Sequence, residues 1–128
     1  MKKIIPYLIL IIVSVTIYLT AFTQEKDEKS GMTVSELKQM QNDSLVILDV
    51  RTEEELTGPL GHIDGIVHIP LQELKMRISE LDKYTGKKVA VICRSGNRSS
   101  TATGFLRQQG FDAHNVEGGM IEYRKKGH

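Results

Sequence analysis

Hydrophobic residues follow two kinds of pattern, which alternate along the sequence. Continuous apolar runs occur in LVILDV, residues 45–50, and in GKKVAVIC, residues 86–93, and such runs are typical of strands buried on both faces. Other segments repeat apolar residues every three or four positions, which predicts amphipathic helices at 34–40, 71–82 and 99–110. Short extended segments are predicted at 65–70 and 111–119. Strands that alternate with helices predict an α/β fold with a mostly parallel central sheet flanked by helices.

The N-terminus has a different pattern. Lys2 and Lys3 precede an uncharged stretch from Ile4 to Phe22 that is rich in Ile, Leu and Val. As a helix it would be about 28 Å long, close to the thickness of a bilayer core, so the sequence predicts a hydrophobic N-terminal helix that targets a membrane. Two alternatives are an uncleaved anchor and a cleaved signal peptide. The best cleavage pattern, Ala21 and Thr23, is weak, which favours the anchor.

These patterns divide the chain into three parts. Residues 1–23 are the signal peptide or membrane anchor, residues 24–31 (QEKDEKSG) are a polar linker, and residues 32–128 form one domain. Because positive residues tend to stay in the cytoplasm, we expect the domain to be extracytoplasmic, either periplasmic or at the cell surface.

Composition excludes several classes of function. The net charge is +1, so nothing predicts a nucleic-acid partner. The single cysteine can form neither an intramolecular disulfide nor an all-cysteine zinc site, and the four histidines are scattered, so we expect no metal and no cofactor.

The one cysteine, Cys93, ends a predicted buried strand and is followed by the loop CRSGNRSS and a helix. Backbone amides in such a loop can converge on an anion, and Gly96 allows a tight turn. With Arg94 and Arg98 nearby, these amides favour a thiolate that is open to solvent and nucleophilic at neutral pH. The alternative is a small hydrophobic residue that only ends a core strand.

The spacing of the loop separates two reactions. Cysteine-dependent phosphatases have the pattern C-x5-R, but here Arg98 follows Cys93 after four residues and Ser99 occupies the phosphatase arginine position. The shorter loop favours attack on a sulfane sulfur over attack on phosphorus. A phosphatase or arsenate reductase is the less favoured alternative.

Four motifs, in order, resemble those of single-domain rhodaneses, the thiosulfate sulfurtransferase-like family: LDVR (48–51), GHIDGIVHIP (61–70), CRSGNRS (93–99) and NVEGGMIEY (115–123). The resemblance implies the rhodanese fold and Cys93 as the catalytic nucleophile that carries a persulfide. It also implies a substrate-binding loop made of Arg94, Ser95, Gly96, Asn97, Arg98 and Ser99. Ile66 and Tyr123 depart from the alanine and tryptophan that are usual in the family, which bears on packing.

Three further residues have two interpretations each. Asp49 and Arg51 either have a functional role, orienting the cysteine loop or binding an acceptor, or form an ordinary ion pair at a strand end. His62 either serves as a base or holds a loop in place, and a thiolate stabilised by amides needs no base.

The expected function is ping-pong sulfur transfer from thiosulfate or a persulfide, through Cys93, to cyanide or a thiol, with a protein acceptor as a further option. A persulfide carrier without fast turnover and a non-catalytic binding module are the alternatives.

Overall fold

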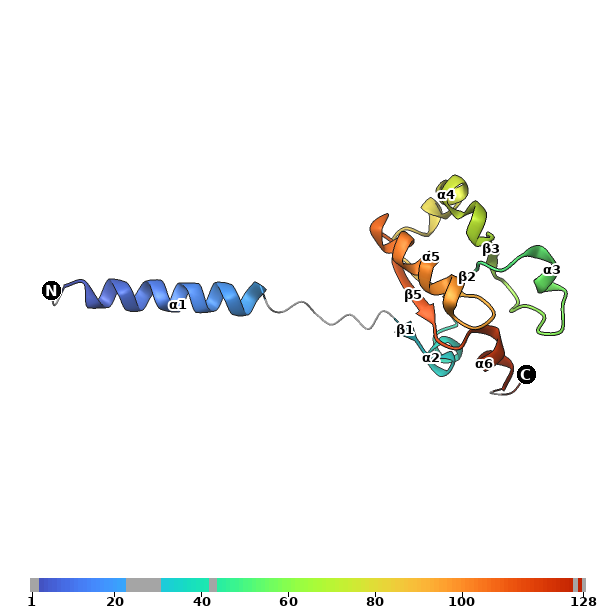
Figure 1. Cartoon of the computed structure of the whole chain (residues 1–128), viewed down its shortest axis with the longest axis horizontal. Helices are drawn as coiled ribbons and strands as arrows, with labels where there is room; N and C mark the ends of the chain where they lie inside the picture. Colours follow the sequence, from blue (N-terminus) through green and yellow to red (C-terminus); the bar gives the residue numbers. More distant parts are fainter. Residues whose placement is uncertain (1–2, 23–30, 42–43, 126, 128) are drawn as a thin grey trace.

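A computed structural model describes residues 3–22, 31–41, 44–125 and 127, and describes side chains of the first helix only as far as Tyr18. That helix, α1 (Ile5–Phe22), forms where the hydrophobic N-terminal stretch predicts one (Figure 1). Among the described residues no helix is both long and apolar enough to cross a membrane, so the expected membrane segment is not confirmed. Thr23 and residues 24–30 of the predicted linker lie outside the described residues.

The domain is built on a parallel sheet of five strands in the order β1-β5-β4-β2-β3. The strands are β1 (Gly31–Met32), β2 (Leu45–Asp49), β3 (Val67–His68), β4 (Lys88–Ile92) and β5 (Asp112–Val116). Every pairing is parallel, and the central pair aligns Asp49 of β2 with Ile92 of β4. The predicted parallel α/β architecture is therefore confirmed. Gly31, which the sequence places in the linker, is already part of the sheet.

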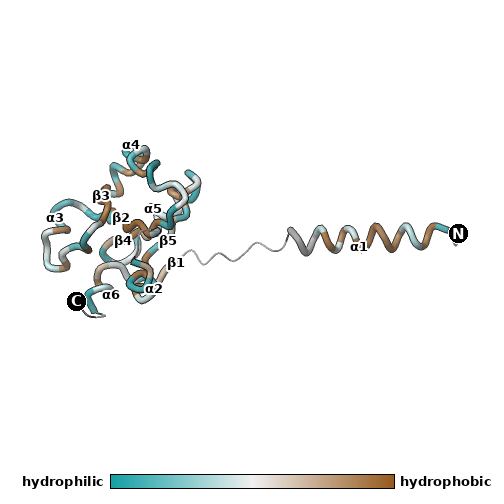
Figure 2. Tube along the Cα trace, turned by 180° about the vertical axis from the view of Figure 1, so that it is seen from behind, coloured by the Kyte–Doolittle hydropathy of each residue, from teal (hydrophilic) through white to brown (hydrophobic). Residues whose placement is uncertain are grey.

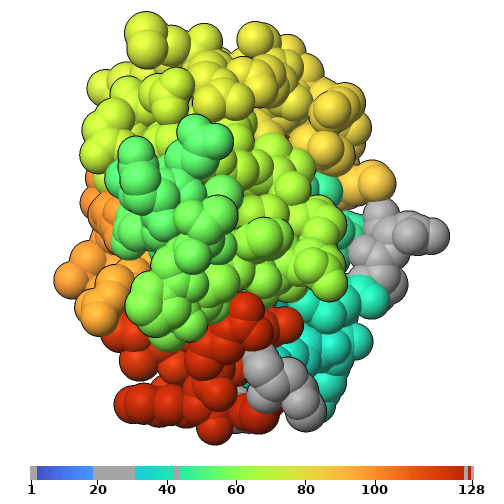
Figure 3. Space-filling model, turned by 90° about the vertical axis from the view of Figure 1, so that its right-hand side faces the viewer, coloured from blue at the N-terminus to red at the C-terminus, as the bar shows by residue number. Residues whose placement is uncertain are grey.

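Helices cover both faces of the sheet. They are α2 (Val34–Gln39), α3 (Glu53–Leu56), α4 (Leu74–Arg77), α5 (Asn97–Gln108) and α6 (Gly119–Lys125), with 3-10 turns η1 (Leu71–Glu73) and η2 (Ile78–Tyr84) on either side of α4. Figure 3 shows α3 and the loop after it (green) on one face of the domain, between the segment around α4 (yellow) and the C-terminal segment (red).

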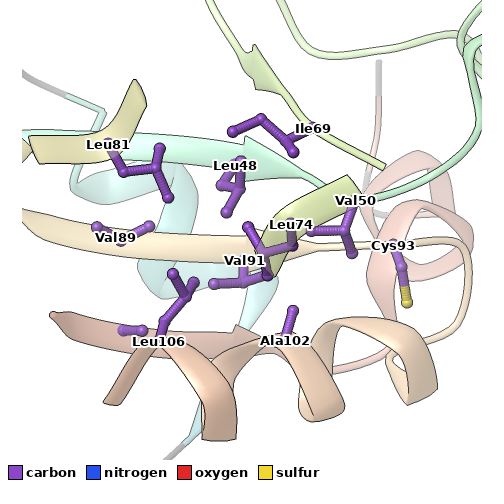
Figure 4. Packing of buried hydrophobic residues seen from close by; sticks show 11 residues of the cluster. Leu48, Val50, Ile69, Leu74, Leu81, Val89, Val91, Cys93, Ala102 and Leu106 are labelled. Carbon is purple, nitrogen blue, oxygen red and sulfur yellow. The ribbon is translucent and has the colours of Figure 1, made fainter. Parts of the chain in front are cut away.

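The side chains of β4, and of Cys93 directly after it, alternate between two hydrophobic clusters. Val89, Val91 and Cys93 point to the face covered by α4 and α5, where Leu74, Leu81 and Leu106 complete the packing (Figure 4). Ala90 and Ile92 point to the opposite face, where they pack with residues of α2 and α6. Both clusters consist of buried residues, and the strands β2 and β4 between them are the hydrophobic centre of the domain in Figure 2. This two-sided burial explains the continuous apolar runs in the sequence.

The segment predicted as one amphipathic helix at 71–82 is divided into η1, α4 and η2. Its apolar residues Leu71, Leu74, Ile78 and Leu81 nevertheless pack against one cluster, as an amphipathic helix would. Two of the three gaps between them are three residues, which matches the three residues per turn of a 3-10 helix. The predicted burial is thus correct, whereas the helical geometry is wrong.

Candidate active site

Cys93 directly follows β4, the strand that lies between β5 and β2 in the sheet. Residues 93–99, called the cysteine loop below, connect this strand to the first turn of α5. Asp49 ends the neighbouring strand β2 at the same edge of the sheet. Ligands of parallel α/β sheets bind beyond this carboxyl edge, so the fold brings the predicted nucleophile to the expected position.

Hydrogen-bond donors converge on the sulfur of Cys93. The amide of Gly96 donates to Sγ over 3.1 Å, and the hydroxyl oxygen of Ser99 lies 3.2 Å from Sγ. Burial raises the pKa of the Cys93 thiol, but the hydrogen bonds that the Ser99 hydroxyl and the amides of Ser99, Gly96 and Ser95 can donate to the thiolate together outweigh it. The net effect is a pKa below the ordinary value for cysteine, which favours the nucleophilic thiolate.

The backbone of Gly96 makes this convergence possible. Gly96 precedes α5 with φ of 108°, a left-handed conformation that residues with a Cβ rarely adopt. It turns the chain so that its own amide faces the sulfur three residues back. The prediction that Gly96 closes a tight loop agrees with this geometry.

The start of α6 fixes the other side of the cysteine loop. The amide of Met120 donates to the carbonyl of Cys93 over 2.9 Å, and the amide of Ile121 donates to the carbonyl of Arg94 over 3.1 Å. Gly119 lies so close that a Cβ there would be 2.5 Å from the Cys93 carbonyl oxygen. The loop's first two carbonyls are therefore held by α6, away from the sulfur, while amides face it.

The burial of Cys93 differs from the prediction. The sequence predicts a sulfur open to solvent, but only 1% of Cys93 is exposed. The side chain points toward α5 and belongs to the hydrophobic cluster that includes Val50, Leu74 and Ala102 (Figure 4). Because Cys93 continues the alternation of Val89 and Val91, its side chain is on the covered face of the sheet. The sulfur is therefore surrounded by hydrogen-bond donors of the cysteine loop, while solvent has little access to it.

The two arginines of the cysteine loop have different surroundings. Arg98 forms a bidentate ion pair with Glu55 of α3, with N–O distances of 2.7 and 2.6 Å. Arg94 is exposed, and among the described residues its guanidinium has no ion pair or hydrogen bond. Arg94 also borders a pocket of 290 Å³ lined by Arg51, Glu55, Gly58, Pro59, Leu60 and Arg94. Of the two loop arginines, Arg94 is therefore the one that has no carboxylate partner among the described residues, and Arg98 is neutralised by Glu55.

Asp49 and Arg51 form a buried ion pair behind the site. The Arg51 guanidinium contacts the Asp49 carboxylate at 2.8 to 3.1 Å, and neither side chain is more than 1% exposed. Arg51 also donates to the carbonyls of Glu55 and Gly61. The pair therefore connects the end of β2 to α3 and to the Gly61 turn, and no hydrogen bond joins it to Cys93.

His62 is exposed, and its Nδ1 lies 3.1 Å from the carbonyl oxygen of Leu56 at the end of α3. This contact agrees with the interpretation that His62 holds the loop after α3. Of the remaining predicted substrate residues, Ser95 and Asn97 are exposed on the cysteine loop.

Three residues of this site were not predicted. Glu55 neutralises Arg98, Asn115 accepts a hydrogen bond from the Ser99 hydroxyl, and Gly119 provides the close approach to the loop. For Glu55 the sequence does carry a signal, because TEEE (52–55) is a capping-box pattern that predicts a helix start at Thr52. Within the described part of the chain, no group of His, Cys, Asp and Glu residues could hold a metal ion.

A cysteine with a lowered pKa at the carboxyl end of a central parallel strand, within a loop of amides, is typical of a cysteine-dependent transfer or carrier site on an α/β fold. Residues 33–126 match the Rhodanese-like domain, and the chain belongs to this family.

Several known proteins are similar to this chain. It is 39% identical over 82 residues to "Putative sulfurtransferase YtwF" of Bacillus subtilis (strain 168), a match that covers 64% of this chain and 76% of that protein. It is 42% identical over 86 residues to "Putative sulfur carrier protein YrkF" of the same organism, covering 66% of this chain but only 44% of that protein. The crystal structure of a rhodanese-related protein from Thermoplasma volcanium superimposes with a TM-score of 0.69 at 35% identity, covering 77% of this chain and 93% of that one.

These similarities support a rhodanese-like sulfurtransferase or sulfur carrier, and they confirm the fold.

Proposed function

We propose that this chain is a sulfurtransferase in which Cys93 carries a persulfide from thiosulfate, or a similar donor, to cyanide or a thiol. The observation that supports the proposal is the convergence of the Gly96 amide and the Ser99 hydroxyl on Sγ of Cys93 at the end of β4. Such donors stabilise both a thiolate and the terminal sulfur of a persulfide anion.

The reaction has two steps. The Cys93 thiolate attacks the outer sulfur of thiosulfate, a new S–S bond forms, and the S–S bond of thiosulfate breaks, so that sulfite leaves with the electron pair. Cyanide then attacks the outer sulfur of the persulfide. Thiocyanate leaves, and the electron pair of the broken S–S bond returns to Cys93 as a thiolate. No oxidant or reductant is required.

Charged groups near the loop have separate roles in this scheme. Arg94 is exposed and unpaired within the described structure, so it attracts the anionic donor to the pocket beside the loop. Arg98 is paired with Glu55 and fixes the first turn of α5 against α3. Its charge still lies close enough to Cys93 to interact with the thiolate.

Intact-mass spectrometry tests the proposal directly. After incubation with thiosulfate, we expect the chain to gain the mass of one sulfur atom, and we expect cyanide to remove that mass and release thiocyanate. Cys93→Ser is the matched control, because it keeps a side chain of similar size without a thiol. Sulfur gain by the serine variant, or no gain by the wild-type chain, would contradict the proposal.

A sulfur carrier is the second candidate, because YrkF is named as one and because Cys93 is only 1% exposed. A carrier would gain the sulfur in the same experiment but would release it to cyanide slowly, compared with release to a partner protein. Steady-state formation of thiocyanate separates the two. Hydrolysis of an aryl phosphate by the wild-type chain would instead favour a phosphatase.

A further inference from the structure

Three side chains from different elements form a row at the candidate active site. Sγ of Cys93, at the end of β4, lies 3.2 Å from Oγ of Ser99 in α5. The Ser99 hydroxyl donates to Oδ1 of Asn115 in β5 over 2.5 Å. Ser99 is completely buried and Asn115 is half-buried, so solvent contributes little to the hydrogen bonding of the hydroxyl.

The number of hydrogens in this row limits which of its groups can donate a hydrogen bond. A serine hydroxyl has one hydrogen, and in this structure Asn115 accepts it. Ser99 therefore presents a lone pair to Cys93, which suits a thiol whose S–H donates to that lone pair. A thiolate has no hydrogen to donate and accepts hydrogen bonds instead, so ionisation of Cys93 favours a Ser99 hydroxyl that turns toward the sulfur and adds a donor to the loop amides.

That turn would leave Oδ1 of Asn115 without its donor, unless the amide also changes. Both ends of the amide are close to the cysteine loop: Oδ1 faces Ser99, and Nδ2 lies 3.9 Å from the position a Cβ on Gly96 would occupy. Rotation of the amide by half a turn exchanges the two ends, and Nδ2 then donates to Oγ of Ser99. An asparagine can either accept a hydrogen bond from the Ser99 hydroxyl or donate one to it, whereas an ionised aspartate can only accept.

We propose that Asn115 is a positioning residue that sets the direction of the Ser99 hydroxyl, and that its amide rotates when Cys93 changes from thiol to thiolate or persulfide. Its relevance to sulfur transfer depends on the function proposed above. The thiol chemistry itself does not, because ionisation of Cys93 can be measured without a sulfur donor.

Other charged groups lie near this row in the fold, and the variants below leave all of them unchanged. Arg94 and Arg98 lie on the cysteine loop. Asp49 ends β2 and Arg51 follows it, Glu55 lies in α3, and Glu117 follows β5.

Asn115→Asp is the main test, since it keeps the shape of the side chain but can only accept. We expect the pH midpoint for alkylation of the thiol by iodoacetamide to rise by about one unit, which is about a tenfold loss of thiolate near neutral pH. Cys93 is the only cysteine in the chain, so the measured rate reports this residue alone.

A double-mutant comparison separates the hydroxyl from the added charge. In a Ser99→Ala background, Asn115→Asp should shift the midpoint by much less, because no hydroxyl is left to orient. The same shift in both backgrounds would show that the new carboxylate acts through space and would overturn the proposal. No shift in the wild-type background would overturn it as well.

A second measurement needs no substitution at Asn115. In the wild-type chain, the side-chain amide signals of Asn115 in a nitrogen–proton NMR spectrum should titrate with the midpoint found for Cys93, and in Cys93→Ser this titration should disappear. Constant Asn115 signals through the ionisation of Cys93 would overturn the proposal. Failure of sulfur transfer in the mass experiment, with these midpoints as expected, would overturn only the proposed function.

Discussion

The Arg98 guanidinium and the Glu55 carboxylate face each other in a bidentate ion pair that joins α5 to α3. The two residues are 43 positions apart in the sequence, and the pair lies on one side of the cysteine loop. Each side chain is about one-third exposed or less. The hydrogen bond from Arg98 is the main reason that the pKa of Glu55 falls from 4.5 to about 2.

Acid should remove the contribution of the Glu55–Arg98 ion pair to the free energy of unfolding within a defined pH range. Because the folded-state pKa of Glu55 is lowered, the stabilisation is fully present above pH 4.5 and is lost as the pH falls toward about 2. We expect Glu55→Gln to lower the free energy of unfolding by about 1 kcal/mol at pH 7. The difference between variant and wild type should shrink as the pH falls from 4.5, as measured by urea unfolding at each pH.

Glu80→Gln is the control for this experiment, since Glu80 forms an exposed ion pair with Arg77. Equal effects of the two substitutions at pH 7 would contradict a special contribution from Glu55.

Gly119→Ala should disturb the cysteine loop. Gly119 has φ of 57°, and an added Cβ would lie 2.5 Å from the carbonyl oxygen of Cys93 and 2.6 Å from that of Arg94. Gly65→Ala is matched, because Gly65 has φ of 77° but nothing within 4 Å of the new Cβ. Each variant acquires about 1–2 kcal/mol of backbone strain, and only Gly119→Ala adds a steric clash.

We expect Gly119→Ala to lose clearly more stability than Gly65→Ala in urea unfolding, and to raise the pH midpoint for alkylation of Cys93. If the two alanine variants behaved alike, contact between α6 and the loop would not be what holds the loop carbonyls.

Asp49→Asn should be strongly destabilising, by about 3–5 kcal/mol, because it leaves the Arg51 charge buried without a carboxylate. Thermal or urea unfolding measures the loss. Asp112→Asn offers a comparison, because Asp112 is half-exposed and pairs with His114, and we expect a change of about 1 kcal/mol or less there. A small effect of Asp49→Asn would mean that water reaches Arg51.

Access to Cys93 should depend on the size of the reagent. Since Cys93 is only 1% exposed, a small methanethiosulfonate should react with the folded chain much faster than a bulky aromatic disulfide. Each rate is divided by the rate of the same reagent with the urea-unfolded chain, which corrects for intrinsic reactivity. We expect the corrected rates to differ by about tenfold or more. Stopped-flow or mass measurements give both rates. Equal protection of Cys93 from both reagents would show that the loop opens fully before either reacts.

Hydrophobic periodicity predicted the helices and strands that bury apolar residues. Leu74 and Leu81 are buried as their spacing predicts, even though the helix around them is broken. By contrast, β1 has two residues and no periodicity of its own, because its pairing with Asn115 and Val116 comes from the other end of the chain. A pattern within one segment cannot reveal such a partner.

In the candidate site, too, the sequence predicted local geometry but not the contacts with distant elements. The spacing from Cys93 to Arg98 and the glycine between them predicted a loop whose amide faces the sulfur, because that geometry is local. The partners that determine what Arg98 and Ser99 do, Glu55 and Asn115, come from distant elements. The burial of Cys93 was also missed, since it depends on the helix that packs over its face of the sheet.

Strand β4 pairs with β2 on one side and β5 on the other, so the backbone that leads to Cys93 is held on both edges. Amide hydrogens in such a strand exchange with deuterium only when a large part of the domain unfolds. We expect a short element such as α3, with four residues, to open locally more often than β4. We therefore expect the motions that would open the proposed site to occur in the elements around the cysteine loop, while Cys93 keeps its position at the end of β4.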